Sequence, residues 1–126
     1  MALRVLLVED ADDVRKLLTL FIGVEGIEVA AVPTGREALD AAAREKFDVL
    51  LTDLRLPDVP GELLIREILA VVTPRPRVVV ISGTDESQVA RATAAGADVV
   101  LRKPFDWEQL RAHIVGPVPH DDVAAA

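Results

Sequence analysis

The sequence predicts an α/β domain in which a parallel sheet is covered by helices on both faces. Three observations predict this fold class. The chain has 126 residues, which suits one domain with one core. Short apolar runs alternate five times with segments of helical period. These runs are nearly continuous, as expected for strands buried on both faces. Periodicity alone does not fix the order of the strands.

Each predicted strand is a short aliphatic run that stops at polar or turn residues. The clearest is Val-Leu-Leu at 49–51, which leads to Asp53 and then to a loop closed by Pro57, Pro60 and Gly61. In open α/β sheets, ligands bind outside the carboxyl ends of the strands, which is where Asp53 falls. The predicted strands are residues 3–8, 27–32, 49–53, 77–81 and 98–102.

The predicted helices begin after capping residues and end at Gly or Pro. They cover residues 11–24, the segments that follow Thr34 and Gly61, residues 85–95, and the segment that follows Asp106. Three pairs have capping-box spacing: Thr34 with Glu37, Asp85 with Gln88, and Asp106 with Gln109.

Apolar side chains at helical spacing predict which face of each helix packs inward. Helix 85–95 has the poorest stripe, Val89 and several Ala, so we expect it to be the least firmly packed. The predicted inward residues are Val14, Leu17, Leu18 and Phe21; Ala38, Leu39, Ala42 and Ala43; Leu64, Ile65, Ile68, Leu69 and Val72; and Trp107, Leu110 and Ile114.

Composition excludes several classes of function. The formal net charge is −7 with no cluster of Lys or Arg, which argues against direct binding of nucleic acid. The chain has no Cys, so disulfides and Cys-based metal sites are excluded. Its longest apolar run, 17–24, is far shorter than the ~18 residues of a membrane span. Acidic residues interrupt the first apolar run too soon for a signal peptide. We therefore expect a soluble, cytoplasmic protein without membrane insertion.

Polar groups at the predicted strand ends indicate phosphoryl chemistry. Glu9, Asp10 and Asp53 follow two strands, and if these strands are neighbours their carboxylates repel one another unless a cation neutralises them. Hard oxygen ligands with room for water suit Mg²⁺. Lys103 and Ser82 follow two other strands and add a positive charge and a hydroxyl. A metal, a lysine and a hydroxyl around a carboxylate suit phosphoryl transfer, with Asp53 as the nucleophile.

Taken singly, each of these residues has an ordinary structural interpretation. Glu9 and Asp10 can cap a helix, and Asp53 and Ser82 can be turn residues. Lys103 alone suits a solvated surface position. The functional interpretation is favoured because four separate strands end in complementary groups within one small domain.

The sequence resembles the receiver domain of two-component response regulators over residues 3–115. The motifs are the acidic pair Glu9 and Asp10, the stretch DLRLPDVPG at 53–61, Ser82, and Lys-Pro-Phe at 103–105. The resemblance implies a flavodoxin-like, doubly wound, five-stranded parallel sheet of order 2-1-3-4-5 with five helices. We assign residues 1–115 to this receiver domain. From Gly116 on, Pro, Asp and a run of Ala show no period, so we expect residues 116–126 to be a disordered tail or linker remnant.

The resemblance further implies a mechanism. Mg²⁺, with Mn²⁺ as the alternative ion, binds Glu9, Asp10, Asp53 and the main-chain carbonyl of Arg55. Asp53 takes a phosphoryl group from the phosphohistidine of a histidine kinase or histidine phosphotransfer protein. Lys103 and Ser82 then bind the phosphoryl oxygens. The switched surface consists of helix 85–95, the strand at 98–102 and the helix that follows Asp106, and an unidentified downstream protein recognises it.

Two positions depart from the family pattern. Val100 stands where many members carry an aromatic residue that changes rotamer, and Gly83 follows Ser82. We therefore expect activation to move backbone more than side chains. Arg55 and Thr84 flank the phosphoryl position, so we expect them to affect the rate of dephosphorylation.

Other functions remain open at this stage. The first is a protein-binding module of the same fold that is never phosphorylated. An aspartate-nucleophile phosphatase needs an acid two residues after the nucleophile, where this chain has Arg55. A flavin carrier usually needs stacking aromatics, which are scarce here. We expect a signalling domain rather than an enzyme, either stand-alone or part of a larger regulator or hybrid kinase.

Overall fold

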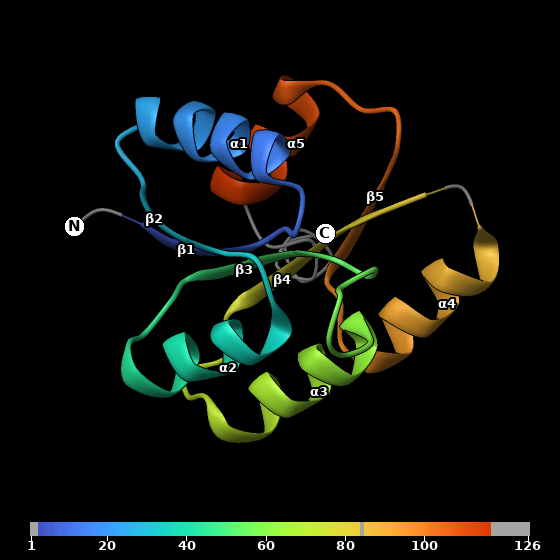
Figure 1. Ribbon diagram of the computed structural model, residues 1–126. Helices are drawn as coiled ribbons and strands as arrows, with labels where there is room; N and C mark the ends of the chain where they lie inside the picture. The colour runs from blue at the N-terminus through green and yellow to red at the C-terminus, as the bar shows by residue number, and fades with distance from the viewer. Residues whose placement is uncertain (1–2, 84, 117–126) are drawn as a thin grey trace, which may run out of the picture.

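The computed structural model describes residues 3–83 and 85–116, which form a parallel sheet between two layers of helices (Figure 1). Helices α1 and α5 cover one face of the sheet, and α2, α3 and α4 cover the other. Residues 117–126, which make up most of the predicted tail, lie outside the described ranges. Thr84 also lies outside them. The strands are β1 (Arg4–Val8), β2 (Glu28–Val32), β3 (Val49–Asp53), β4 (Arg77–Ser82) and β5 (Val99–Arg102). The helices are α1 (Asp12–Val24), α2 (Gly35–Arg44), α3 (Gly61–Val71), α4 (Glu86–Ala95) and α5 (Trp107–Val115).

The sheet has the order β2-β1-β3-β4-β5, and every strand pair is parallel, which confirms the predicted fold. Strands β1 and β3 are neighbours, with Val8 paired to Thr52. Asp53 is paired to Ile81 on β4. Because all strands run the same way, the residues that follow them gather at one edge of the sheet.

Successive side chains of the strands point to opposite faces and form two apolar layers. Leu50 belongs to the layer under α2, α3 and α4, whereas Leu51 belongs to the layer under α1 and α5. Both side chains are fully buried. This burial holds the carboxyl end of β3, and therefore Asp53, in a fixed position.

In two of the three predicted capping boxes, the cap side chain accepts from the backbone N–H three residues further on, as the spacing predicts. Glu37 N–H donates to Thr34 Oγ1 at 3.1 Å, and Asp106 forms a complete capping box with Gln109. In α4, Asp85 caps the helix, but its side chain accepts from Ser87 N–H at 2.9 Å. The reciprocal half of that box does not form, because the Gln88 side chain turns toward Ser82 instead.

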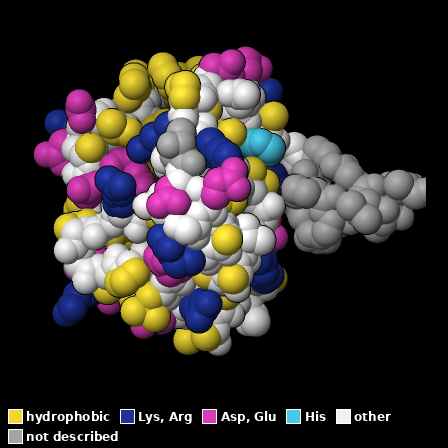
Figure 2. Space-filling view, turned by 90° about the vertical axis from the view of Figure 1, so that its right-hand side faces the viewer, with side chains coloured by type: hydrophobic (Ala, Val, Ile, Leu, Met, Phe, Trp, Pro, Cys, Tyr) yellow, Lys and Arg dark blue, Asp and Glu magenta, His cyan; other side chains and the backbone are white. Residues whose placement is uncertain are grey.

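The predicted inward face of α1 is wrong in part. Leu18 and Ile22 are the buried residues of this helix, whereas Val14, Leu17 and Phe21 remain substantially exposed. The helix is apolar on more than one side, so periodicity could not identify the side that meets the sheet. Figure 2 shows hydrophobic side chains gathered at the top of the view, over α1 and α5.

In α2 the prediction of Ala43 is also wrong, since Ala43 is exposed and Ala41 is buried instead.

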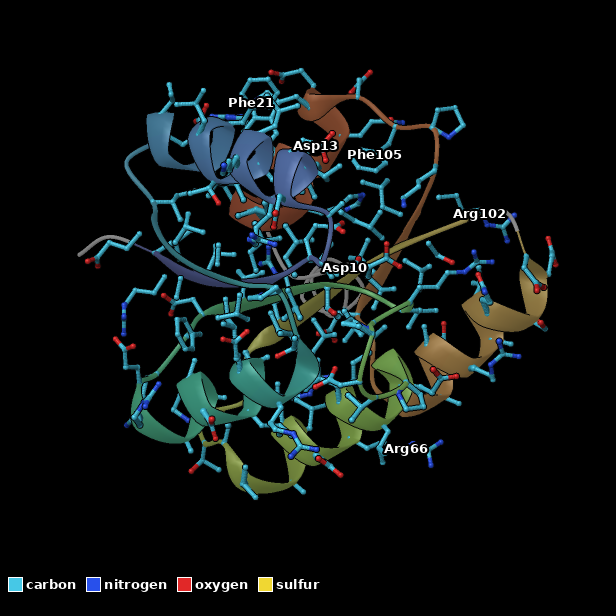
Figure 3. All side chains as sticks on the ribbon, in the orientation of Figure 1. Asp10, Asp13, Phe21, Arg66, Arg102 and Phe105 are labelled. Atoms are coloured by element: carbon cyan, nitrogen blue, oxygen red, sulfur yellow. The ribbon has the colours of Figure 1, made fainter. Side chains whose placement is uncertain are left out.

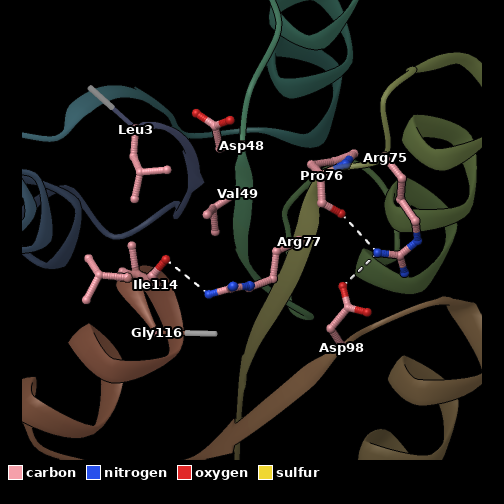
Figure 4. A pocket seen from close by; sticks show the side chains of 10 residues that line it. Leu3, Asp48, Val49, Arg75, Pro76, Arg77, Asp98, Ile114 and Gly116 are labelled. Atoms are coloured by element: carbon pink, nitrogen blue, oxygen red, sulfur yellow. Dashed lines mark hydrogen bonds and ion pairs between the residues drawn. The ribbon is translucent and has the colours of Figure 1, made fainter. Parts of the chain in front are cut away.

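A cavity of about 410 Å³ lies at the other end of the strands, away from Asp53 (Figure 4). Two arginines that line this cavity connect neighbouring elements. Arg77 Nη1 donates to the carbonyl oxygens of His113 and Ile114, at 2.7 and 3.2 Å, and so ties the end of α5 to β4. Arg75 pairs with Asp98 at 2.7 Å. None of the helices in the described ranges has the length and hydropathy to cross a membrane.

Candidate functional site

The carboxyl edge of the sheet brings the predicted polar residues to two adjoining cavities. Glu9, Asp10, Asp53, Arg55 and Lys103 line one end of a cavity of about 690 Å³. A second cavity of about 290 Å³ also contacts Asp53, Arg55 and Lys103, and extends beneath the start of α4. The structure therefore brings groups from β1, β3 and β5 together here, whereas Ser82, the predicted group from β4, is not among the residues that line either cavity.

Asp53 lies between a cation and a backbone donor. Its Oδ2 is 3.3 Å from Lys103 Nζ, and its Oδ1 accepts from Arg55 N–H at 3.0 Å. The Asp53 side chain is mostly buried, whereas that of Lys103 is about half exposed. Lys103 N–H donates to the Ser82 carbonyl at 2.9 Å, which holds the end of β5 beside β4. The lysine thus reaches the carboxylate from a position fixed by the sheet.

Glu9 is a buried acid in an acidic neighbourhood. The residue is only 6% exposed, and Oε2 accepts from Ala11 N–H at 3.0 Å. Burial raises the pKa of Glu9, and the nearby carboxylates of Asp53 and Asp10 raise this pKa further. Asp10 itself is exposed in the loop between β1 and α1 (Figure 3). A cation placed among these three acids would relieve their mutual repulsion.

The donor chemistry of this edge fits a hard divalent cation, since carboxylate and carbonyl oxygens are the ligands that Mg²⁺ prefers. The side chains are not, however, arranged as a metal site. Among the described residues there is no group of three Asp, Glu, His or Cys side chains placed to hold a metal ion. The magnesium set of Glu9, Asp10, Asp53 and the Arg55 carbonyl therefore stays a prediction.

Ser82 is buried at the end of β4, with 1% of its surface exposed. Its hydroxyl donates to Gln88 Oε1 at 3.3 Å. Sequence reasoning missed Gln88 as a site residue, because its spacing from Asp85 indicated a capping box. Gly83 is exposed, and a Cβ added there would lie 4.0 Å from Gln88 Oε1. Val100 is partly buried, pairs with Val80, and packs on the layer under α2, α3 and α4.

An apolar groove continues from the acidic site along α1 and α5. We call the side chains of Val14, Leu17, Phe21, Phe105 and Trp107 the α1–α5 groove, because all line the same cavity as Asp53. The rings of Phe21 and Trp107 meet with centroids 5.6 Å apart. Figure 3 shows Phe21 on α1 and Phe105 in the segment before α5. The apolar residues Val14, Leu17 and Phe21 of α1 were the signal for this groove in the sequence, where they were predicted to face the core.

Strand order and the position of the acidic site define a flavodoxin-like domain of the CheY type. The chain belongs to the response regulator receiver domain family, whose family model matches residues 5–115. It is therefore a signalling domain of two-component systems.

Two relatives and two solved structures illustrate the similarity. The transcriptional regulatory protein KdpE of Mycobacterium tuberculosis is 33% identical over 121 residues, which are 96% of this chain and 53% of that protein. Regulatory protein AtoC of Escherichia coli is 31% identical over 107 residues, 85% of this chain and 23% of AtoC. The chain thus spans about half or less of the length of these curated relatives.

A CheY-like receiver domain protein from Methanospirillum hungatei has a TM-score of 0.88 at 24% identity, covering 98% of this chain and 99% of that one, a similarity of fold. A response regulator from Burkholderia pseudomallei has a TM-score of 0.83 at 26% identity, covering 98% of this chain and 73% of that one. That structure is described as having a phosphorylated aspartic acid, a calcium ion and citrate.

Proposed function

We propose that this chain is a cytoplasmic phosphoacceptor domain whose Asp53 receives a phosphoryl group from a phosphohistidine. The donor would be a histidine kinase or a histidine phosphotransfer protein. The observation that carries the proposal is the position of the Asp53 carboxylate, at the end of β3 and 3.3 Å from Lys103 Nζ. The proposed receiver domain ends at Val115, and the residues after it serve as a linker or tail.

In the proposed reaction, a carboxylate oxygen of Asp53 attacks phosphorus. A P–O bond forms while the P–N bond to the donor imidazole breaks, and the imidazole leaves as the neutral ring once it is protonated. Lys103 provides positive charge to the phosphoryl oxygens, and Arg55 N–H orients the carboxylate. Glu9, Asp10, Asp53 and the Arg55 carbonyl would hold Mg²⁺ or Mn²⁺, which when bound neutralises charge on the transferred group. The phosphorylated aspartate and the calcium ion of the Burkholderia pseudomallei relative support this chemistry.

The α1–α5 groove is the surface that we assign to the phosphodonor protein. A phosphohistidine must reach Asp53, and this groove opens onto Asp53 within one cavity. Its aromatic side chains, Phe21, Phe105 and Trp107, are of the kind enriched in protein interfaces. A small phosphodonor needs no such surface, and this difference provides a test.

The response to phosphorylation is proposed at α4, β5 and α5. In α4 only Ala92 and Ala95 are buried, so few apolar contacts resist its movement. Ion pairs from Arg91 to Glu62 and from Arg102 to Glu86 join α4 to α3 and β5. The proposed target is a downstream protein surface rather than nucleic acid, located in another protein or in the remainder of a longer chain. Arg55 and Thr84 are proposed to set the lifetime of the phosphoryl group.

Incubation with acetyl phosphate and Mg²⁺, followed by intact mass measurement, tests the proposal. We expect one phosphoryl group on the wild type and none on Asp53→Asn. Asp40→Asn, which changes an exposed acid on α2, is the matched control and should be modified like the wild type. If the wild type is not modified by acetyl phosphate or by any histidine kinase, the alternative of an unphosphorylated protein-binding module replaces this proposal.

A further inference from the structure

The hydroxyl of Ser82 has one proton to donate, and in this structure it donates that proton to Gln88 Oε1 at 3.3 Å. Ser82 is buried, so its hydroxyl depends on a protein partner. In the proposed function, the same proton would be donated to a phosphoryl oxygen on Asp53. Ser82 cannot fully serve both acceptors, so Gln88 and the phosphoryl group compete for one hydrogen-bond donor.

Gln88 occupies a position that links the site to α4. Its backbone N–H bonds to the Asp85 carbonyl at 3.1 Å, in the first turn of the helix. Its side chain lines the cavity of about 290 Å³ together with Asp53, Lys103 and Gly83. The hydrogen bond from Ser82 to Gln88 therefore connects the end of β4 directly to the start of α4, across the loop that contains Gly83.

We propose that Gln88 is a positioning residue that holds Ser82 and the first turn of α4 in the unphosphorylated arrangement. Phosphorylation of Asp53 redirects the Ser82 hydroxyl from Gln88 to the phosphoryl oxygen, and the first turn of α4 loses its bond to β4. This inference rests on the proposed function. In this account, a side chain on α4 opposes the switch. The residue at the family's aromatic position is Val100, which has no ring that could take this role.

Two variants of Gln88 should shift the switch in opposite directions. Gln88→Met keeps the length of the side chain but removes the acceptor, so the unphosphorylated arrangement loses a stabilising hydrogen bond. Gln88→Glu provides a charged acceptor, which binds the hydroxyl more strongly and repels an anion. A neutral hydrogen bond of this kind corresponds to about a two- to tenfold change in an equilibrium constant. The proposal predicts tighter binding of a phosphoryl mimic by Gln88→Met and weaker binding by Gln88→Glu.

The experiment is a titration of the full chain with beryllofluoride in the presence of Mg²⁺, followed by backbone amide NMR. The proteins are the wild type, Gln88→Met, Gln88→Glu, Ser82→Ala and the double variant Ser82→Ala with Gln88→Met. The control is Thr93→Ala, which removes an exposed side-chain bond within α4 to the Val89 carbonyl. Thermal unfolding of each variant verifies that it is folded.

We expect Gln88→Met to bind beryllofluoride about two- to tenfold more tightly than the wild type, and we expect the same substitution to have no effect in the Ser82→Ala background. Equal affinities of Gln88→Met and the wild type would overturn the inference. An equal change in both backgrounds would also overturn it, because Gln88 would then act without Ser82. If wild-type Asp53 accepts neither beryllofluoride nor a phosphoryl group, the proposed function fails together with this inference. Normal binding by the wild type with no effect of Gln88 rejects only the inference.

Discussion

Replacing Leu17 by Gln should impair phosphorylation by a protein donor and leave phosphorylation by acetyl phosphate unchanged. Leu17 lines the cavity that contains Asp53, and the residue is 50% exposed. Complete burial of a Leu side chain contributes about 1.5–3 kcal/mol, so burial of the exposed half by a partner contributes about 0.7–1.5 kcal/mol. We therefore expect the efficiency of transfer at low protein concentration to fall about three- to twelvefold.

The matched control is Leu20→Gln, since Leu20 is 62% exposed on the same helix but does not line this cavity. The assay compares initial rates of phosphoryl transfer from a purified histidine kinase that phosphorylates the wild type, with acetyl phosphate as the second donor. Equal losses for Leu17→Gln and Leu20→Gln, or an equal loss with acetyl phosphate, would refute the assignment of the α1–α5 groove to the donor.

Three further predictions concern stability and switching. Lys103→Met should lower the free energy of unfolding by no more than about 1 kcal/mol, because the lysine is half exposed, yet it should abolish the response of α4 amides to beryllofluoride. Leu50→Ala should lower the free energy of unfolding by about 2–5 kcal/mol in urea, because Leu50 is fully buried. The Asp58 carboxylate accepts two N–H groups at the start of α2, which hold its pKa below the usual range. The Asp58 carboxylate therefore contributes stability above its unfolded-state pKa, and this contribution is lost as the pH falls through its folded-state pKa. We expect the loss of stability in acid to be smaller in Asp58→Asn than in the wild type. Unfolding measured at a series of pH values tests this.

Much of the fold could be predicted because local patterns and global topology agree in this chain. Fully apolar runs such as 49–51 indicate strands buried on both faces, and Thr34 and Asp106 cap the helices as their spacing predicts. The strand order came from the family resemblance, since periodicity contains no information about neighbours. Once β1 and β3 are adjacent, the positions of Glu9 and Asp53 follow from the parallel arrangement.

The errors come from residues whose local pattern suits more than one environment. Helix α1 is apolar on more than one side, and only packing against the sheet and α5 selects Leu18 and Ile22 for the core. Gln88 has the spacing of a capping residue, but Ser87 supplies the donors to Asp85, and the Gln88 amide accepts from a buried hydroxyl instead. Both errors hid site residues, because the contacts concerned lie between separate elements, β4 with α4 and α1 with α5, and helical spacing alone does not report on them.

Intact mass measurement after incubation with a phosphorylated histidine kinase tests the central proposal most directly. We predict that the wild-type chain gains one phosphoryl group, that peptide mapping places it on Asp53, and that Asp53→Asn gains none. Modification of the Asp53→Asn variant to the same extent as the wild type, or phosphorylation at a residue away from the carboxyl end of β3, would contradict the proposed phosphoacceptor site.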